Sequence, residues 1–517
     1  MEKFCHKTIH ILLTMIMFLT VGLCLFGNSA EYVCKKEFML PNVVYACAGG
    51  VLLIAIAFAA QHLGKYLQRT KWSDFIMMGL SLAFFGFLVV LTYHYYFRTG
   101  WDAQVVHWAA EMVVESEINR MPYFSYYPNN AFIVFLFSVA IRIGRLARIS
   151  NGYFCIVTMQ CFLFAVTAFV LYRTAVLLAN ERVALAVWVV YVMIPGLSPW
   201  VTVPYSDATG LLFPALLFYL YVYICKKKKY TMPVLAMGGL ACIGYYIKPQ
   251  IIIVIIAVLM TTAFSFRKKW LSEKSRLWKI ALLAVGGLIG GYCLVTLAVN
   301  ATNMEINKEM SMGMPHYLML GLNEEYGGMI NIVDQEFSRT FDTSKERNAA
   351  NLEVAFERIR EMGPGGMLRL WKNKTLTNFS DGTFARWEEG EFFADQMYEG
   401  NPTIRAYLSS YFYEGGSLYE LFKGNSQLLW MGLLLLMCVG LVVRVAGKDV
   451  RREETVLKLS LIGIIVFELL FEARARYLFI YVPLMILLTC HNIGWVTDKC
   501  KAFAAKKRKK KESGKSR

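Results

Sequence analysis

The sequence predicts an all-α polytopic membrane protein, and three observations support this class. First, 57% of its 517 residues are hydrophobic and 15% are aromatic, whereas only 18% are charged. Second, the mean hydropathy is +0.44. Third, apolar stretches of nearly membrane-spanning length recur along most of the chain. Because about a quarter of the residues of a soluble globule are charged, we exclude a soluble multidomain protein.

The apolar stretches that could cross a bilayer as helices number thirteen, so we expect about 12–13 transmembrane helices. They lie at about 9–27, 41–61, 74–95, 131–148, 151–172, 183–198, 209–225, 231–247, 250–266, 279–299, 427–446, 456–471 and 477–493.

These stretches divide the chain into six regions. We expect N-terminal transmembrane helices (1–95), a first extracytoplasmic loop with catalytic residues (96–130), a transmembrane core (131–299), an extracytoplasmic domain (300–426), C-terminal transmembrane helices (427–495) and a basic cytoplasmic tail (496–517).

The first apolar stretch has two interpretations. Lys3 and Lys7 precede it, and it ends near Gly27-Asn28-Ser29-Ala30, as a cleaved signal peptide would. Its length is also close to that of a membrane span, which favours an uncleaved first helix.

The net charge of +17 predicts the orientation in the membrane. Residues 226–229 carry +4, residues 267–279 carry +5 and residues 501–517 carry +8, which accounts for the whole net charge. Basic segments beside membrane helices stay in the cytoplasm. We therefore expect 96–130 and 300–426 outside the cell membrane and the tail inside. The basic run 506–511 of the tail has no interleaved aromatic residues, which argues against binding of nucleic acid.

This orientation leaves one inconsistency. An even number of crossings must separate the two outer loops 96–130 and 199–208, but three candidate stretches lie between them. Arg142, Arg145 and Arg148 in this region favour the cytoplasmic side. Either one stretch is only half-inserted, or four short helices lie in 131–198.

Two outer stretches are too large to be simple connectors. Ala103–Asn119 has apolar residues on one side and glutamates elsewhere, which predicts an amphipathic helix at the membrane surface. Residues 301–425 carry nineteen acids and twelve bases, and their aromatic residues argue against disorder. We expect a mixed insertion there, either a modest folded domain or a set of ordered loops.

Two aspartates follow membrane helices on the predicted outer face. Asp102 lies in Gly100-Trp101-Asp102-Ala103-Gln104, and Asp207 lies in Tyr205-Ser206-Asp207. A carboxylate at this level can act as a general base toward an acceptor hydroxyl. The alternative is that each aspartate is only a helix N-cap, a position that Asp favours.

Other polar residues lie at the same predicted level. Tyr127, Asn129 and Asn130 precede an apolar stretch and could bind a sugar, although aromatic residues also mark many membrane boundaries. Lys248 could neutralise a phosphate or could only extend to the membrane surface.

The run Glu472-Ala473-Arg474-Ala475-Arg476-Tyr477 interrupts the last apolar hairpin on the predicted outer face. Arginines on that face oppose the usual charge distribution. Because Arg is suited to binding phosphate, we interpret Arg474 and Arg476 as ligands of an anion and Tyr477 as a substrate contact.

The predicted outer domain contains two specific polar-aromatic runs, Pro315–Asn323 and Asp381–Phe384. His316, in the first run, is a candidate substrate-binding residue or a structural histidine. The sequence contains no HExxH, Walker loop or Cys/His cluster. The cysteines lie mostly in apolar stretches without CxxC, so we interpret them as core residues without a metal or redox role.

These motifs together resemble the GT-C superfamily of glycosyltransferases that use polyprenyl-phosphate sugars. Within it, the chain looks like the bacterial branch related to protein O-mannosyltransferases and aminoarabinose transferases, in a form typical of Gram-positive bacteria. The resemblance covers most of residues 74–490. It rests on the order and shared face of Trp101-Asp102, Tyr127-Pro128-Asn129-Asn130, Tyr205-Ser206-Asp207, Lys248-Pro249, Pro315–Asn323 and Arg474-Ala475-Arg476-Tyr477.

The resemblance implies a role for each matching residue. Asp102 matches the loop aspartate that acts as base or orients the acceptor, and Asp207 matches the second-loop acid. Lys248, Arg474 and Arg476 match residues near the carrier phosphate. Two departures are visible: Ala103 follows Asp102 where several relatives have Glu, and three apolar stretches precede the first loop where many relatives have one.

The resemblance implies a membrane enzyme that moves a sugar from undecaprenyl phosphate to an extracellular glycopolymer, glycolipid or protein, with inversion. Its partners would be the lipid-linked donor, the acceptor and the bilayer, with no cofactor and no indicated metal, although some relatives use a divalent metal. The alternatives are a lipid-linked sugar transporter or flippase, which would place charges nearer the bilayer midplane, and a non-catalytic partner in wall-glycan assembly.

Overall fold

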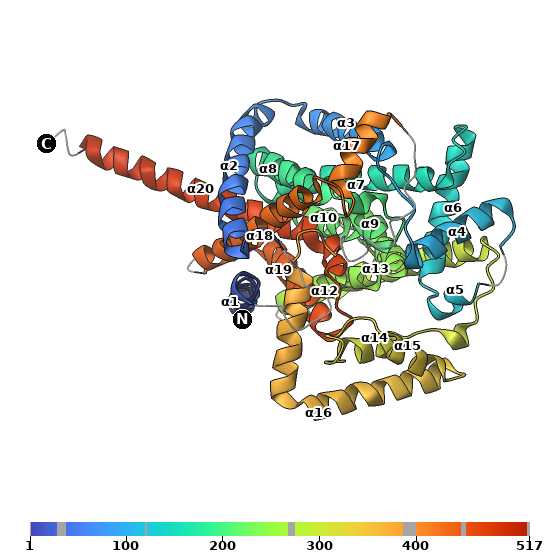
Figure 1. Ribbon diagram of the computed structural model, residues 1–517. Helices are drawn as coiled ribbons and strands as arrows, with labels where there is room; N and C mark the ends of the chain where they lie inside the picture. The colour runs from blue at the N-terminus through green and yellow to red at the C-terminus, as the bar shows by residue number, and fades with distance from the viewer. Residues whose placement is uncertain are drawn as a thin grey trace.

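A computed structural model describes residues 2–27, 38–118, 121–266, 274–385, 400–445 and 451–513. Part of the basic stretch 267–279, the end of the tail, residues 386–399 of the predicted outer domain and the possible cleavage site at Asn28–Ala30 lie outside these residues. The described part is helical without β-strands (Figure 1), as expected for an all-α polytopic membrane protein.

Within the described residues, eight helices are long and apolar enough to cross a membrane, by length and composition. They belong to α1 (Glu2–Phe26), α2 (Asn42–Gln68), α3 (Ser73–Tyr93), α7 (Gly152–Leu178), α9 with α10 (Ser206–Gly210 and Leu212–Lys227), α13 (Lys274–Asn300), α18 (Tyr419–Arg444) and η6 with α20 (Ala475–Tyr481 and Val482–Ser513).

The remaining candidate stretches are also helical, but they are shorter or more polar. They form α6 (Asn130–Leu146), α8 with the π-helical turn η1 (Glu181–Tyr191 and Val192–Gly196), α11 (Thr231–Ile247), η3 with α12 (Pro249–Ile252 and Ile253–Phe266) and α19 (Arg452–Leu470).

The other described helices lie in the loops. They are α4 (Trp101–Glu115), α5 (Pro122–Tyr126), η2 (Pro199–Thr202), η4 (Lys308–Met310), α14 (Met314–Gly321), α15 (Ile332–Arg339), α16 (Ser344–Phe379) and α17 (Pro402–Phe412).

Long-range contacts distinguish the two ends of the helix bundle. At one end, Lys226 lies 3.0 Å from Glu453, and Arg451 donates to the carbonyl of Leu178. We call this the tail end, because it is the end from which α20 and the basic tail extend (Figure 1). The opposite end carries Asp102 and Tyr205, and we call it the site end.

The first helix, α1, packs as a member of the bundle. It contacts α18 and α19. The His6 ring bonds to the Thr455 hydroxyl (2.6 Å), and the His10 ring bonds to the Leu441 carbonyl (3.0 Å). These buried contacts favour the interpretation of residues 9–27 as a transmembrane helix.

Glycines allow close approach of α11 and α13. A methyl group added at Gly238 would lie 2.3 Å from the Ala284 carbonyl oxygen, and one added at Gly287 would lie 2.1 Å from that of Leu235. Small residues at helix contacts are a common means of association within membranes. Five of the eleven cysteines in the described residues are buried, whereas Cys47 and Cys293 are exposed on the surfaces of α2 and α13.

The structure favours a half-inserted segment for the region 131–198. Helix α6 lies alongside α4 and runs in the same direction. Asn130 at its start bonds to Tyr205, which donates to Asp102 at the start of α4. Near its end, Arg142 donates to the Val113 carbonyl (3.4 Å) and Arg145 pairs with Glu115. Arg142 and Arg145 are therefore joined to the first loop, not to the tail end as their charge suggests.

The next two helices then supply an even number of crossings. Asn151, before α7, donates to the Tyr96 hydroxyl (2.6 Å) just beyond α3, at the site end. Arg182, in the first turn of α8, donates to Gln68 at the tail end of α2 (2.9 Å). Helices α7 and α8 therefore run to the tail end and back, and the parity problem is resolved.

The insertion after α13 is helical in its described part, not mixed. Helices α14, α15 and α16 pack together beside the site end (Figure 1). Lys374 of α16 is fully buried and donates to the carbonyls of Gly321 (2.8 Å) and Phe471. These carbonyls lie at the C-terminal ends of α14 and α19, so this lysine joins the insertion to the membrane core. Burial lowers the pKa of Lys374 to about 7.

Candidate functional site

A hydrogen-bonded group of polar side chains surrounds Asp102 at the site end. The Tyr205 hydroxyl donates to Asp102 Oδ2 (3.1 Å). Asn130 Nδ2 donates to the hydroxyls of Tyr205 (3.3 Å) and Tyr123 (2.6 Å), and Asn129 Nδ2 donates to Asn130 Oδ1 (3.1 Å). Asn130 and Tyr205 are buried, whereas Asp102 is half-buried. The group therefore joins α4, α6 and the segment before α9 around one half-buried carboxylate.

Neither predicted aspartate is a helix cap. The N-cap of α4 is Gly100, and that of α9 is Tyr205, so Asp102 and Asp207 are each the second residue of their helix. Asp207 is fully buried, and its carboxylate pairs with Lys248. The cap-only alternative is therefore wrong for both residues.

Arg476 lies among three aromatic rings of this site. Its guanidinium carbon is 4.4 Å from the ring centroid of Trp101 and 5.5 Å from those of Tyr205 and Tyr477. The backbone of Trp101 has a φ of 44°, in the left-handed region that bulky residues rarely adopt. Such strained backbone concentrates at functional sites, and here it turns the indole toward both Arg476 and Tyr205.

Lys248 connects the two halves of the site. It is only 4% exposed, so it does not extend to the membrane surface. Its ammonium pairs with Asp207 and lies 4.6 Å from the ring centroid of Tyr477. The Tyr477 hydroxyl donates in turn to Glu472 Oε1 (2.9 Å). Direct contacts therefore link Asp207 to Lys248, Lys248 to Tyr477, and Tyr477 to Glu472.

The acid at the start of the last loop belongs to the same site. Glu472 is buried, which raises the pKa of its carboxyl, and the charge of Arg476 opposes this effect. Arg474 is half-buried and acts electrostatically on the same carboxylate. The sequence pointed to Arg474, Arg476 and Tyr477 but assigned no role to Glu472.

Tyrosines from the first loop and the insertion surround Asp102 further. The ring centroids of Tyr127 and Tyr123 lie 5.1 Å apart. Burial, followed by the charge of Asp102, raises the pKa of Tyr127 to about 12. Burial, followed by the nearby Tyr127, Glu472 and Asp102, raises the pKa of the half-buried Tyr317 of α14 well above its usual value. The insertion therefore contributes to the site through Tyr317, which sequence reasoning missed.

His316, next to Tyr317, lies in the interior of the insertion. It is 1% exposed and bonds through Nδ1 to the Ser338 hydroxyl (2.7 Å), which donates to Asn351 Oδ1 (3.0 Å). Burial lowers its pKa to about 4. Successive residues of a helix point about 100° apart, so Tyr317 is directed to the site and His316 away from it. The structure supports the structural alternative for His316.

The run Asp381–Phe384 also has a structural environment. The buried Asp381 carboxylate accepts from the backbone N–H groups of Thr383 and Ala385 (both 2.8 Å), and the Thr383 carbonyl accepts from Trp200 Nε1 (3.1 Å). The run therefore packs against η2, to which Trp200 belongs, and has a structural role.

One further acid near the site was missed by sequence reasoning. Glu468 of α19 is fully buried, and neither carboxylate oxygen has a hydrogen-bond partner among the described residues. Lys248 and Lys374 provide its main opposite charge. The sequence gives little signal for it, because a single Glu within an apolar stretch does not reveal its neighbours.

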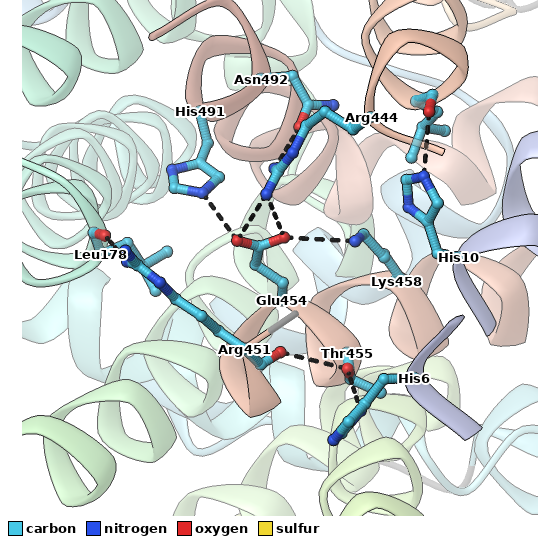
Figure 2. Close-up of polar contacts among 11 residues, drawn as sticks. His6, His10, Leu178, Arg444, Arg451, Glu454, Thr455, Lys458, His491 and Asn492 are labelled. Carbon is cyan, nitrogen blue, oxygen red and sulfur yellow. Dashed lines mark hydrogen bonds and ion pairs between the residues drawn. The ribbon is translucent and has the colours of Figure 1, made fainter. Parts of the chain in front are cut away.

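A second buried polar network lies at the tail end. Figure 2 shows Glu454 of α19 at its centre. Its carboxylate accepts from Arg444 (2.9 Å), Lys458 (3.3 Å) and His491 (3.1 Å), and Arg444 also donates to Asn492 (2.8 Å). The network joins α18, α19 and α20, and we interpret it as a structural tie because one buried carboxylate binds side chains from all three helices.

The fold and these two networks define an integral, multi-pass membrane protein with a polar-aromatic site at one end of its bundle. Residues 1–495 match the family described as conserved hypothetical integral membrane proteins, and the chain belongs to this family. A comparison with curated proteins finds no match. Within the described residues, no group of three or more His, Cys, Asp or Glu side chains is arranged to hold a metal ion.

Proposed function

We propose that the protein is a membrane glycosyltransferase that moves a sugar from a polyprenyl phosphate to a hydroxyl of an extracellular glycopolymer, glycolipid or protein. One observation carries this proposal: a half-buried carboxylate, Asp102, lies in one aromatic-lined site with the cations Arg476 and Lys248. The first loop and the last loop are far apart in the sequence, yet both contribute to this site.

The chemistry of transfer requires a base and an anion site. The acceptor oxygen attacks the anomeric carbon, the bond from that carbon to the phosphate oxygen breaks, and Asp102 takes the acceptor proton. The electrons of the broken bond remain on the polyprenyl phosphate, whose charge Arg476, Arg474 and Lys248 stabilise. Attack opposite the leaving group inverts the anomeric centre.

The surrounding residues position these groups. The Tyr205 hydroxyl orients Asp102, and Asp207 fixes Lys248 beside Tyr477. Tyr127, Asn129 and Asn130 contact the sugar or the acceptor. Polyprenyl phosphate has its tail in the hydrocarbon and its sugar in water, and a site at one end of the bundle suits such a substrate.

The direct test is sugar transfer in proteoliposomes with a labelled polyprenyl-phosphate sugar and a cell-envelope glycan fraction. We expect Asp102→Asn to lower transfer at least about 100-fold, because the amide cannot accept the proton. Asp342→Asn makes the same chemical change at an exposed acid of the insertion and is expected to retain transfer.

The same assay separates the alternatives. Full transfer by Asp102→Asn would remove this residue from the mechanism. Labelled carrier that changes leaflet without sugar reaching the acceptor would identify a flippase. Neither transfer nor flipping by the wild-type protein, tested with several sugars, would favour a non-catalytic partner.

A further inference from the structure

A groove lies at the tail end between α10 and α11, remote from the site described above. It has a volume of about 690 Å³. The last three turns of α10 contribute Tyr219 and Tyr223, and the first turns of α11 contribute Met232 and Ala236. These side chains give the groove a largely apolar wall within two membrane helices.

Two lysines lie at the open end of this groove. Lys228 and Lys229 both line it and are exposed, and the structure gives them no acidic partner among the described residues. Lys226, in contrast, pairs with Glu453 at 3.0 Å. The left-handed backbone of Lys228, with a φ of 56°, ends α10 there and turns the chain toward α11. The groove therefore combines uncompensated positive charge with an apolar wall.

The membrane environment limits what this combination can bind. Met232 is 73% exposed at the start of α11, so the apolar wall continues onto the lipid-facing surface. Tyrosines such as Tyr219 and Tyr223 are typical of the boundary between hydrocarbon and headgroups. A matching ligand carries its negative charge at headgroup level and its apolar part in the hydrocarbon. Basic pockets between membrane helices on the cytoplasmic side bind anionic lipid headgroups in this way.

We propose that this groove binds one anionic phospholipid from the leaflet at the tail end. Its phosphate contacts Lys228 and Lys229, and an acyl chain lies along Met232 and Ala236. The site is separate from the Asp102 site, so it stands whether or not the chain is a glycosyltransferase.

The test is native mass spectrometry of the full chain, purified in detergent and supplied with phosphatidylglycerol or phosphatidylcholine. We expect one phosphatidylglycerol to be retained in preference to phosphatidylcholine. Changing Lys228→Gln and Lys229→Gln together is expected to lower this retention about tenfold or more, because each lysine at a membrane surface contributes to anionic-lipid binding. Ala236→Phe, which fills the groove without a change in charge, is expected to lower retention of the same lipid.

A matched control removes two charges elsewhere. Lys65→Gln with Lys501→Gln changes two exposed lysines outside the groove and is expected to leave retention unchanged. Equal loss in this control would show general attraction to basic protein and overturn the proposal. Equal retention of phosphatidylcholine would overturn it, as would displacement of phosphatidylglycerol by millimolar glycerol phosphate, which would indicate a soluble-anion site. All variants are compared as monodisperse protein, and the lysine pair, on the surface, decides the outcome if Ala236→Phe does not fold.

Discussion

At the scale of single residues, the environment of each side chain decides between chemical and structural roles that its sequence context leaves open. Asp102 and Asp207 occupy the same helix position in α4 and α9, yet one is half-buried beside Tyr205 and the other is fully buried against Lys248. Their similar motifs therefore lead to different roles. A carboxylate that accepts an acceptor proton must be accessible, whereas a buried one is suited to holding a cation.

The buried histidine of the insertion predicts a pH dependence. The His316 pKa falls from 6.5 to about 4 on folding, so the unfolded chain binds the proton more readily. The contribution of neutral His316 to the free energy of unfolding is fully present above pH 6.5 and is lost as the pH falls toward 4. Below pH 4 no more is lost, and the total loss is up to about 3 kcal/mol. We expect His316→Asn, whose amide can still bond to Ser338, to flatten the fall of the unfolding midpoint between pH 6.5 and 4.

The measurement is thermal unfolding of purified protein at several pH values. His62→Asn, at an exposed position on α2, is the matched control and is expected to keep the wild-type profile. An unchanged slope in His316→Asn would show that other groups cause the loss of stability in acid.

At the scale of helices, charged side chains within apolar segments serve as ties between them. Lys374 donates to carbonyls at the C-terminal ends of α14 and α19, and Glu454 holds α18 and α20 against α19. Charged groups are costly to bury in a membrane protein unless they are paired. Their partners therefore determine which helices lie side by side.

Removal of the central acid of the tail-end network is expected to destabilise the bundle. Glu454→Gln leaves Arg444 and Lys458 buried without a carboxylate, which costs about 3–5 kcal/mol. We expect a clear fall in the thermal unfolding midpoint, and partial recovery when Lys458→Met is added, because one uncompensated charge is then removed.

The control for this prediction is Glu420→Gln at the other end of α18. Glu420 is 54% exposed, whereas its partner Lys423 is half-buried, and because water solvates the glutamate we expect a change below about 1 kcal/mol. If Glu454→Gln were no more destabilising than Glu420→Gln, the network would not be the tie that we infer.

At the scale of the whole molecule, the proposals depend on which end of the bundle faces the cytoplasm. The positive-inside rule predicts the tail end, because it carries Lys226–Lys229 and the basic tail. A reporter fused after Lys229 is therefore expected to fluoresce as a cytoplasmic fusion. A phosphatase fused after residue 330, within the insertion, is expected to be active outside.

The opposite fusion pattern would contradict the orientation. The site end would then face the cytoplasm, and transfer to an extracellular acceptor could not occur there. Intermediate positions test the arrangement of α4 and α6: fusions after residues 118 and 150 are expected to report the same side, because α6 lies alongside α4 without crossing.

Sequence alone determined the class, the positions of the helices and the residues at their ends. All thirteen predicted apolar stretches are helical, because a backbone in hydrocarbon must satisfy its own hydrogen bonds. The charge pattern also predicted which loops group together, except around α6. The arginines of α6 suggested that its end lies at the tail end of the bundle. The ion pair of Arg145 with Glu115 places it instead beside the first loop.

Only the tertiary structure decided which polar residues meet. The pairing of Asp207 with Lys248, the position of Arg476 on Trp101 and the network of Glu454 join residues from separate helices. Hydropathy depends on the composition of one segment, whereas these contacts depend on how helices rotate and pack against one another. For that reason the sequence determines which helix carries a charged residue and where along that helix it lies. The packing of the helices decides which residue it pairs with and what role it has.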